Sequence, residues 1–187
     1  PGISAEEVDD VIMGCAMQQG SSGYNIGRLA AVASGLPNSV SGMSMDRQCA
    51  SGMMAIATAA KQILVDNMPI VIGGGLESIS LVQTEHANKY RTTDANVLAL
   101  SPNAYKPMLQ TAEIVAQRYG ISRAAQDAYS LQSQQRTAAA QAAGKFDDEI
   151  VPLASSKGVM NKDTKEISFE STLLTRDEGN RADTSLE

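Results

Sequence analysis

The sequence contains no tryptophan, and its aromatic residues are limited to two phenylalanines and five tyrosines. A hydrophobic core therefore has to be built from aliphatic side chains and from the nine methionines. No run approaches the roughly 18 consecutive apolar residues that a membrane-spanning helix requires. No signal peptide is recognisable either. These absences predict a chain that does not enter a membrane.

Cysteine and histidine are also scarce, with two cysteines and one histidine in 187 residues. Cys15 and Cys49 form no disulfide framework, and with His86 they do not have the spacing of a zinc site. We therefore expect no metal, a reducing compartment and a cytoplasmic location. The net charge of −6 excludes the basic surface typical of proteins that bind nucleic acid or anionic membranes.

The first 80 residues alternate between strand and helix patterns. Hydrophobic residues make up 43% of the chain and charged residues 19%, which is typical of a globular protein. The alternation predicts a layered α/β domain over residues 1–80. Its strands are expected near Val11–Cys15, Asn38–Asp46 and Pro69–Gly75, and its helices within 23–37 and over Gly52–Leu64. The second helix is apolar on nearly every side, which predicts that it is buried in the middle of the domain.

The remainder, residues 81–187, is predicted to form a second, mostly helical subdomain. It begins with a polar, irregular stretch at Thr84–Lys106. Helix and strand patterns follow at Thr111–Tyr119, Ser122–Ala143, Glu149–Ala154 and Glu166–Ser171. Ser122 is a suitable helix N-cap, and a hairpin-like loop is expected at Lys157–Glu166.

Cys49 lies at a predicted corner between a strand and a helix. There the free N–H groups of the first helical turn and the helix dipole favour an anion. They can lower the pKa of a thiol from about 8.5, and they can stabilise the oxyanion of an acyl adduct. Two interpretations stay open from this pattern alone, a nucleophile and a small buried residue that packs well.

The other two candidate reactive residues have simpler interpretations. His86 lies in the polar stretch "TEHANKY" and is expected to be an exposed loop residue rather than a catalytic base. Cys15 ends a predicted strand and is expected to be packed and inert.

Four segments carry a resemblance to a known family: "RQCASGMMAI", "GGGLESIS", "TAEIVAQRYGISRAAQDAYSLQSQQRTAAAQAAGKFDDEIVPL" and "RDEGNRADTSLE". In this order they resemble the thiolase family over essentially all 187 residues. The helical stretch and loop resemble most closely the bacterial degradative type, acetyl-CoA acyltransferase or acetyltransferase. The resemblance implies a thiolase-like layered α/β half, apparently incomplete. Residues 1–80 would be the N-terminal domain without its opening strand, and 81–187 the loop domain that contacts coenzyme A.

The resemblance also implies roles for individual residues. Cys49 matches the Cys-x-Ser-Gly cysteine that is acylated, with its own backbone N–H donating to the thioester oxyanion. The other implied positions are Gly74, Gly75 and Ser78 in the cavity wall, Met108 near the pantetheine arm and Arg181 at the nucleotide end of coenzyme A. Pro107 stands where family members often carry a histidine. Coenzyme A is a substrate, and no cofactor is implied.

The implied activity is acyl transfer between a 3-ketoacyl-CoA and coenzyme A, by thiolytic cleavage or Claisen condensation, in fatty acid degradation. Thiolases form homodimers or homotetramers. The Gly-His-Pro, Cys-x-Gly-Gly and Asn-Glu-Ala-Phe motifs of their C-terminal half do not occur in this sequence, so this portion alone is expected to be inactive. Two alternatives remain: a non-catalytic acyl-CoA- or lipid-binding protein of thiolase descent, and a subunit completed by a separate C-terminal polypeptide.

Overall fold

The computed structural model describes residues 2–186. It divides the chain into two compact units, residues 1–94 and 95–187, and each unit is described by itself. The boundary that the sequence suggested at residue 80 falls inside the first unit, within the short helix α3 (Ile79–Val82).

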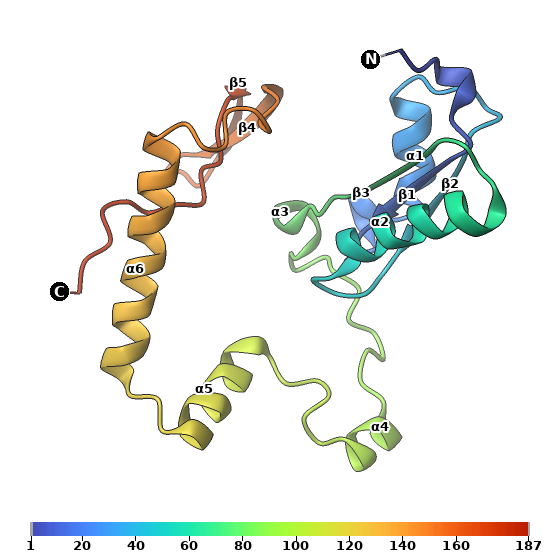
Figure 1. The fold of residues 1–187 in the computed structure, drawn as a ribbon. Coiled ribbons are helices and arrows are strands. Elements are labelled where there is room, and N and C mark those ends of the chain that lie inside the picture. Colours follow the sequence, from blue (N-terminus) through green and yellow to red (C-terminus); the bar gives the residue numbers. More distant parts are fainter. Residues whose placement is uncertain (1, 187) are drawn as a thin grey trace. The chain divides into compact units, whose positions relative to one another are not determined.

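A three-stranded parallel sheet forms the centre of the first unit. Its strands β1 (Asp10–Gly14), β2 (Ser41–Met45) and β3 (Val71–Gly75) lie in the order β2-β1-β3. Helix α1 (Ile26–Ala33) connects β1 to β2, and α2 (Ser51–Lys61) connects β2 to β3 (Figure 1). The two crossovers run to opposite edges of β1, and right-handed crossovers of this kind place their helices on opposite faces of the sheet.

The side chains of β1 alternate between the two faces. Val11 packs with Ala31 of α1 and with Val40, whereas Ile12 packs with Ala55 and Ala59 of α2. Successive strand residues point to opposite faces, so each helix covers its own face of the sheet. The layered α/β architecture expected from the alternating pattern is confirmed.

Short elements complete the first unit. They are the 3₁₀ turns η1 (Ala5–Glu7) and η2 (Gly20–Ser22), the π-helical turn η3 (Gln62–Asp66) and α3. The observed β1 begins and ends one residue before the predicted strand, although the Cys15 N–H still donates a hydrogen bond to the Met45 carbonyl at 2.9 Å.

The prediction that the helix after Cys49 is buried on nearly every side is wrong for this structure. Ala55 and Ala59 are buried against the sheet, but Met53 is 74% exposed and Ile56 59% exposed. The helix also continues from Lys61 directly into η3, where Leu64 is exposed. The pattern correctly indicated apolar surface on all sides, but within the described residues only the sheet-facing side is covered.

The second unit contains three helices and one hairpin among its described residues: α4 (Ala95–Leu100), α5 (Met108–Tyr119), α6 (Arg123–Ala142), β4 (Leu153–Met160) and β5 (Ile167–Leu174). Gly120, with φ +63°, ends α5. The predicted N-cap of α6 is confirmed, because the Ser122 side chain accepts a hydrogen bond from the Ala125 N–H.

Three expectations for the second unit need correction. The stretch expected to be irregular contains α4, and α5 begins at Met108 rather than at residue 111. The strands of the hairpin are longer than the strand patterns in the sequence predicted. Lys157–Met160, expected in the loop, belong to β4, and Met160 pairs with Ile167 at the end of the hairpin. Strand propensity is weak in this serine-rich sequence, so the pairing itself sets the strand ends.

Within residues 2–186, no helix combines the length and the apolar character needed to cross a membrane.

Candidate active site

Cys49 lies in a tight turn between β2 and α2, and the side chain of Ser51 holds that turn. The Ser51 Oγ accepts a hydrogen bond from the Arg47 N–H at 2.9 Å and donates one to the Gln48 carbonyl at 2.6 Å. Ser51 is only 4% exposed. Gln48 has a left-handed backbone with φ +48°, a conformation that costs free energy for a residue other than glycine. The Ser51 side chain therefore stabilises the turn that carries Cys49.

The exposure of Cys49 argues against the interpretation that this cysteine is a small, buried packing residue. Its thiol is free and exposed, and it immediately precedes the N-cap residue of α2, Ala50. The N–H groups of a first helical turn have no partner within the helix, and with the helix dipole they favour negative charge. The position thus combines an accessible thiol with the N-terminal end of a helix.

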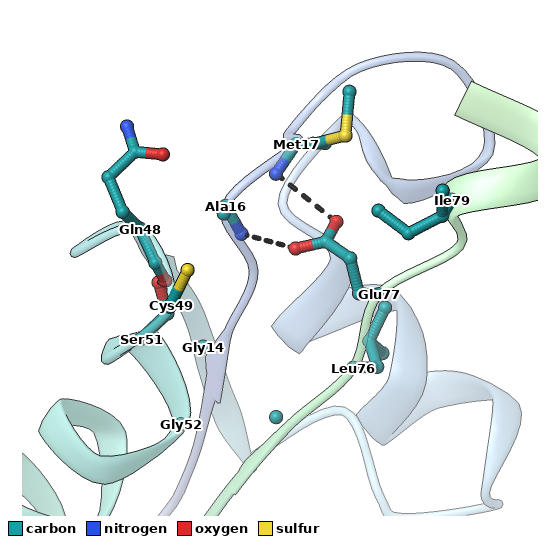
Figure 2. Close-up of a pocket in the computed structure, with 11 residues that line it drawn as sticks. Gly14, Ala16, Met17, Gln48, Cys49, Ser51, Gly52, Leu76, Glu77 and Ile79 are labelled. Atoms are coloured by element: carbon teal, nitrogen blue, oxygen red, sulfur yellow. Dashed lines mark hydrogen bonds between the residues drawn. The ribbon is translucent and has the colours of Figure 1, made fainter. Parts of the chain in front are cut away.

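A cavity of about 620 Å³ opens beside Cys49. Its described lining comes from the carboxyl ends of β1 and β3 and from the start of α2. It includes Gly75 and, as Figure 2 shows, Gly14, Cys49 and Glu77. In open α/β sheets, ligands bind outside the carboxyl ends of strands, where the connections diverge to opposite faces. With the order β2-β1-β3, the connections diverge between β1 and β3, and the cavity lies at the carboxyl ends of these two strands.

Two glycines allow the start of α2 to approach the sheet closely. A Cβ atom on Gly14 would lie 2.2 Å from the backbone carbon of Ser51, and one on Gly75 would lie 3.1 Å from the Cα of Gly52. Neither distance leaves room for a side chain without movement of the backbone. The absence of side chains at these positions therefore fixes where the cysteine turn lies.

Glu77 ties two walls of the cavity together. Its carboxylate accepts hydrogen bonds from the N–H groups of Ala16 at 2.8 Å and Met17 at 3.2 Å (Figure 2). It also accepts one from the thiol of Cys15 at 3.4 Å. Sequence reasoning did not assign Glu77 a role. It is the only charged residue of the "GGGLESIS" segment, and a charge in such an apolar, glycine-rich setting was the available signal.

Cys15 is a packed residue, as predicted. It is 1% exposed. Burial raises the pKa of the Cys15 thiol, and the hydrogen bond to Glu77 and the negative charge of Glu77 raise it further. The thiol therefore stays protonated at neutral pH, as its role as a donor to Glu77 requires.

The structure brings some of the residues named from the sequence together and separates others. Cys49 and Gly75 line the same cavity, whereas Gly74 and Ser78 are absent from its described lining. A Cβ on Gly74 would meet the sulfur of Met13 instead, at 3.3 Å. Ser78 occupies the N-cap position of α3.

The remaining named residues lie elsewhere. Met108, the first residue of α5, is 73% exposed, and Arg181 is exposed in the segment after β5. Both belong to the second unit. His86 is an exposed loop residue, as predicted, with its Nε2 3.6 Å from a Glu85 carboxylate oxygen. The described residues contain no group of three or more His, Cys, Asp or Glu arranged to hold a metal ion.

Alkylation should distinguish the two cysteines. In the native protein at neutral pH, we expect iodoacetamide to modify Cys49 and leave Cys15 intact, because Cys49 is exposed whereas Cys15 is buried and its pKa is raised. Peptide mass spectrometry measures both sites. In urea, which removes the difference in burial, both should react. Faster labelling of Cys15 than of Cys49 in the native protein would contradict the assignment.

Comparison with known proteins identifies the family to which the chain is similar. Residues 1–187 match the family model described as the thiolase N-terminal domain. The chain is 38% identical over 203 residues to a beta-ketoadipyl-CoA thiolase of Pseudomonas putida, covering 100% of this chain and 48% of that protein. It is 36% identical over 180 residues to a 3-ketoacyl-CoA thiolase of Bacillus subtilis, covering 96% of this chain and 45% of that protein.

A solved structure shares the fold. The crystal structure of the Bacillus anthracis acetyl-CoA acetyltransferase matches with a TM-score of 0.74 and 32% identity, covering 98% of this chain and 46% of that one. The chain spans about half the length of the curated relatives that it matches.

Proposed function

Because the chain belongs to the thiolase family, we propose that it supplies the acyl-accepting cysteine of a thiolase. The reaction is transfer of an acyl group between a 3-ketoacyl-CoA and coenzyme A. The observation that carries this proposal is the exposed thiol of Cys49, held at the start of α2 in a cavity at the carboxyl ends of β1 and β3. Among its relatives are a beta-ketoadipyl-CoA thiolase and a 3-ketoacyl-CoA thiolase.

The proposed chemistry proceeds in two steps. In the first, the Cys49 thiolate attacks the 3-keto carbonyl carbon of the substrate. The bond between C2 and C3 then breaks, and the C2 carbanion takes up a proton to leave as acetyl-CoA. In the second step, coenzyme A gives up its thiol proton, which balances the proton taken up by the carbanion, and its sulfur attacks the Cys49 thioester. This releases the shortened acyl-CoA and regenerates the thiolate. The reverse sequence is a Claisen condensation.

The chain's own groups support parts of this sequence. We propose that the backbone N–H of Cys49, which directly precedes the N-cap residue of α2, stabilises negative charge on the thioester oxygen. No histidine occurs among the described lining residues of the cavity. Help from a general base is worth about 10²–10⁴-fold, so we propose that the base comes from the sequence that thiolases carry beyond this portion. The 187-residue portion alone is then inactive or nearly so.

The second unit is proposed to hold coenzyme A. Arg181 is assigned to the nucleotide end, because a guanidinium pairs with phosphate oxygens and stacks on an adenine ring. Met108 is assigned to the pantetheine arm, and its exposed, flexible thioether suits an apolar wall. We further propose a homodimeric or homotetrameric, cytoplasmic enzyme of fatty acid degradation.

Trapping the acyl-enzyme tests the proposal. The complete protein is mixed with acetoacetyl-CoA, quenched in acid and digested, and the peptides are weighed. We expect an acetyl group on the peptide that contains Cys49, because the first step transfers the acyl group to that sulfur. The peptide with Cys15 serves as the internal control. Tight binding of acyl-CoA without any adduct on Cys49 would favour the non-catalytic acyl-CoA-binding protein instead.

A further inference from the structure

The segment that follows β5 has no helix or strand of its own among its described residues, yet it is fastened to α6 at two points. The Gln141 side chain donates a hydrogen bond to the Asp177 carbonyl at 3.1 Å. Two turns earlier on the same face of the helix, Gln134 makes the second attachment, to Asn180 and Arg181. Helix α6 therefore holds this irregular segment in place through side-chain hydrogen bonds.

The second attachment is the denser one. The Gln134 Oε1 accepts hydrogen bonds from the Asn180 Nδ2 and from the Arg181 N–H, both at 2.8 Å. The Asn180 Nδ2 also donates to the backbone carbonyl of Gln134 at 3.0 Å. Gln134 and Asn180 are both partly buried, which shields these bonds from competing water.

Arg181 is thereby held through its backbone. Its N–H donates to Gln134, and its carbonyl accepts from the Thr184 N–H at 3.2 Å and from the Thr184 Oγ1 at 2.7 Å. The residue itself is exposed. Both of its main-chain polar groups are thus satisfied, while the guanidinium stays accessible to a ligand.

We propose that Gln134 is a positioning residue for Arg181, presetting this arginine for the phosphates of coenzyme A, with Asn180 as its partner. The inference rests on the proposed function, which assigns Arg181 to the nucleotide end. Ordering an irregular segment costs conformational entropy, and a segment that is fastened beforehand avoids that cost when the ligand binds. Gln134 never touches the ligand and acts through the backbone of Arg181.

The test is Gln134→Met in the complete protein, which keeps the approximate shape of the side chain but removes the acceptor. We expect the KM for coenzyme A in thiolysis to rise about five- to tenfold, the loss that corresponds to one or two hydrogen bonds. The kcat should stay unchanged. When N-acetylcysteamine replaces coenzyme A in both the thioester and the acceptor thiol, the variant and the wild type should behave alike, because no nucleotide is present. An equal loss with both substrates would mean a merely structural role and overturn the inference.

Matched variants separate the possible failures. Gln135→Met changes the neighbouring exposed glutamine and should leave the KM at the wild-type value. Asn180→Ala removes the other partner of this contact and should raise the KM for coenzyme A in the same way. This variant provides the test if Gln134→Met folds poorly. If Arg181→Ala raises the KM for coenzyme A but Gln134→Met and Asn180→Ala do not, the inference alone is overturned. If Arg181→Ala leaves the KM unchanged, the proposed role of Arg181 fails as well. Absence of acyl transfer in the wild type would count against the proposed function itself.

Discussion

Replacing Cys49 by serine should lower kcat for thiolysis of acetoacetyl-CoA by at least about 10³-fold in the complete protein. A serine hydroxyl fits the same space but is far less acidic than a thiol, so the nucleophilic anion is lost. Cys49 is exposed and makes no core contact, so the fold should be retained. Steady-state kinetics measures the loss, and circular dichroism checks the fold.

The matched control is Cys15→Ser. A hydroxyl can donate to Glu77 as the thiol does, and Cys15 is not part of the described cavity lining. We expect its kcat to stay within about twofold of the wild type. Wild-type turnover by Cys49→Ser would remove the sulfur from the mechanism and with it the assignment of the site.

Replacing Gly14 by alanine should have the second large effect, a loss of about 3 kcal/mol in the free energy of unfolding. The added Cβ would lie 2.2 Å from the Ser51 backbone carbon and 2.4 Å from the Gly52 nitrogen. To remove this overlap, the first turn of α2 has to move away from β1, and the turn that carries Cys49 moves with it. Activity should therefore fall together with stability. Urea unfolding of the complete protein measures the change.

Gly52→Ala is the matched control for stability. The nearest atom to its added Cβ is the Gly75 Cα at 3.9 Å, and alanine is the better helix former by roughly 0.5–1 kcal/mol. The free energy of unfolding should stay the same or rise slightly. Equal stability of Gly14→Ala and the wild type would show that the start of α2 is free to shift.

The position of Cys49 could be predicted from the sequence because it depends on local patterns. Strand and helix periodicities on either side of Met45–Met54 place the cysteine at a corner, and the observed turn lies there. The supporting contacts could not be predicted in the same way. Ser51 stabilises the turn only because Gln48 adopts a left-handed backbone, a conformation that no sequence pattern near Gln48 signals.

Contacts between polar residues that lie far apart in the chain could not be predicted from the sequence either. Gln134 lies on a helix of weakly amphipathic composition and resembles a solvent-exposed residue, and its bond to Asn180 depends on how the chain returns after the hairpin. The same limit explains the error about α2. An apolar pattern states which faces a helix is able to bury, but it does not state what covers Met53 or Ile56.

The side of α2 that faces the sheet is built from the smallest apolar residues. A Cβ on Gly73 would lie 2.9 Å from the Ile56 Cα and 3.2 Å from the Ala59 Cβ, and Ala55 is fully buried at the same contact. The spacing between helix and sheet is therefore set by Gly73, Ala55 and Ala59, and none of these belongs to the described lining of the cavity beside Cys49. A larger side chain at any of these three positions should therefore push the start of α2, and the turn that carries Cys49, away from the sheet.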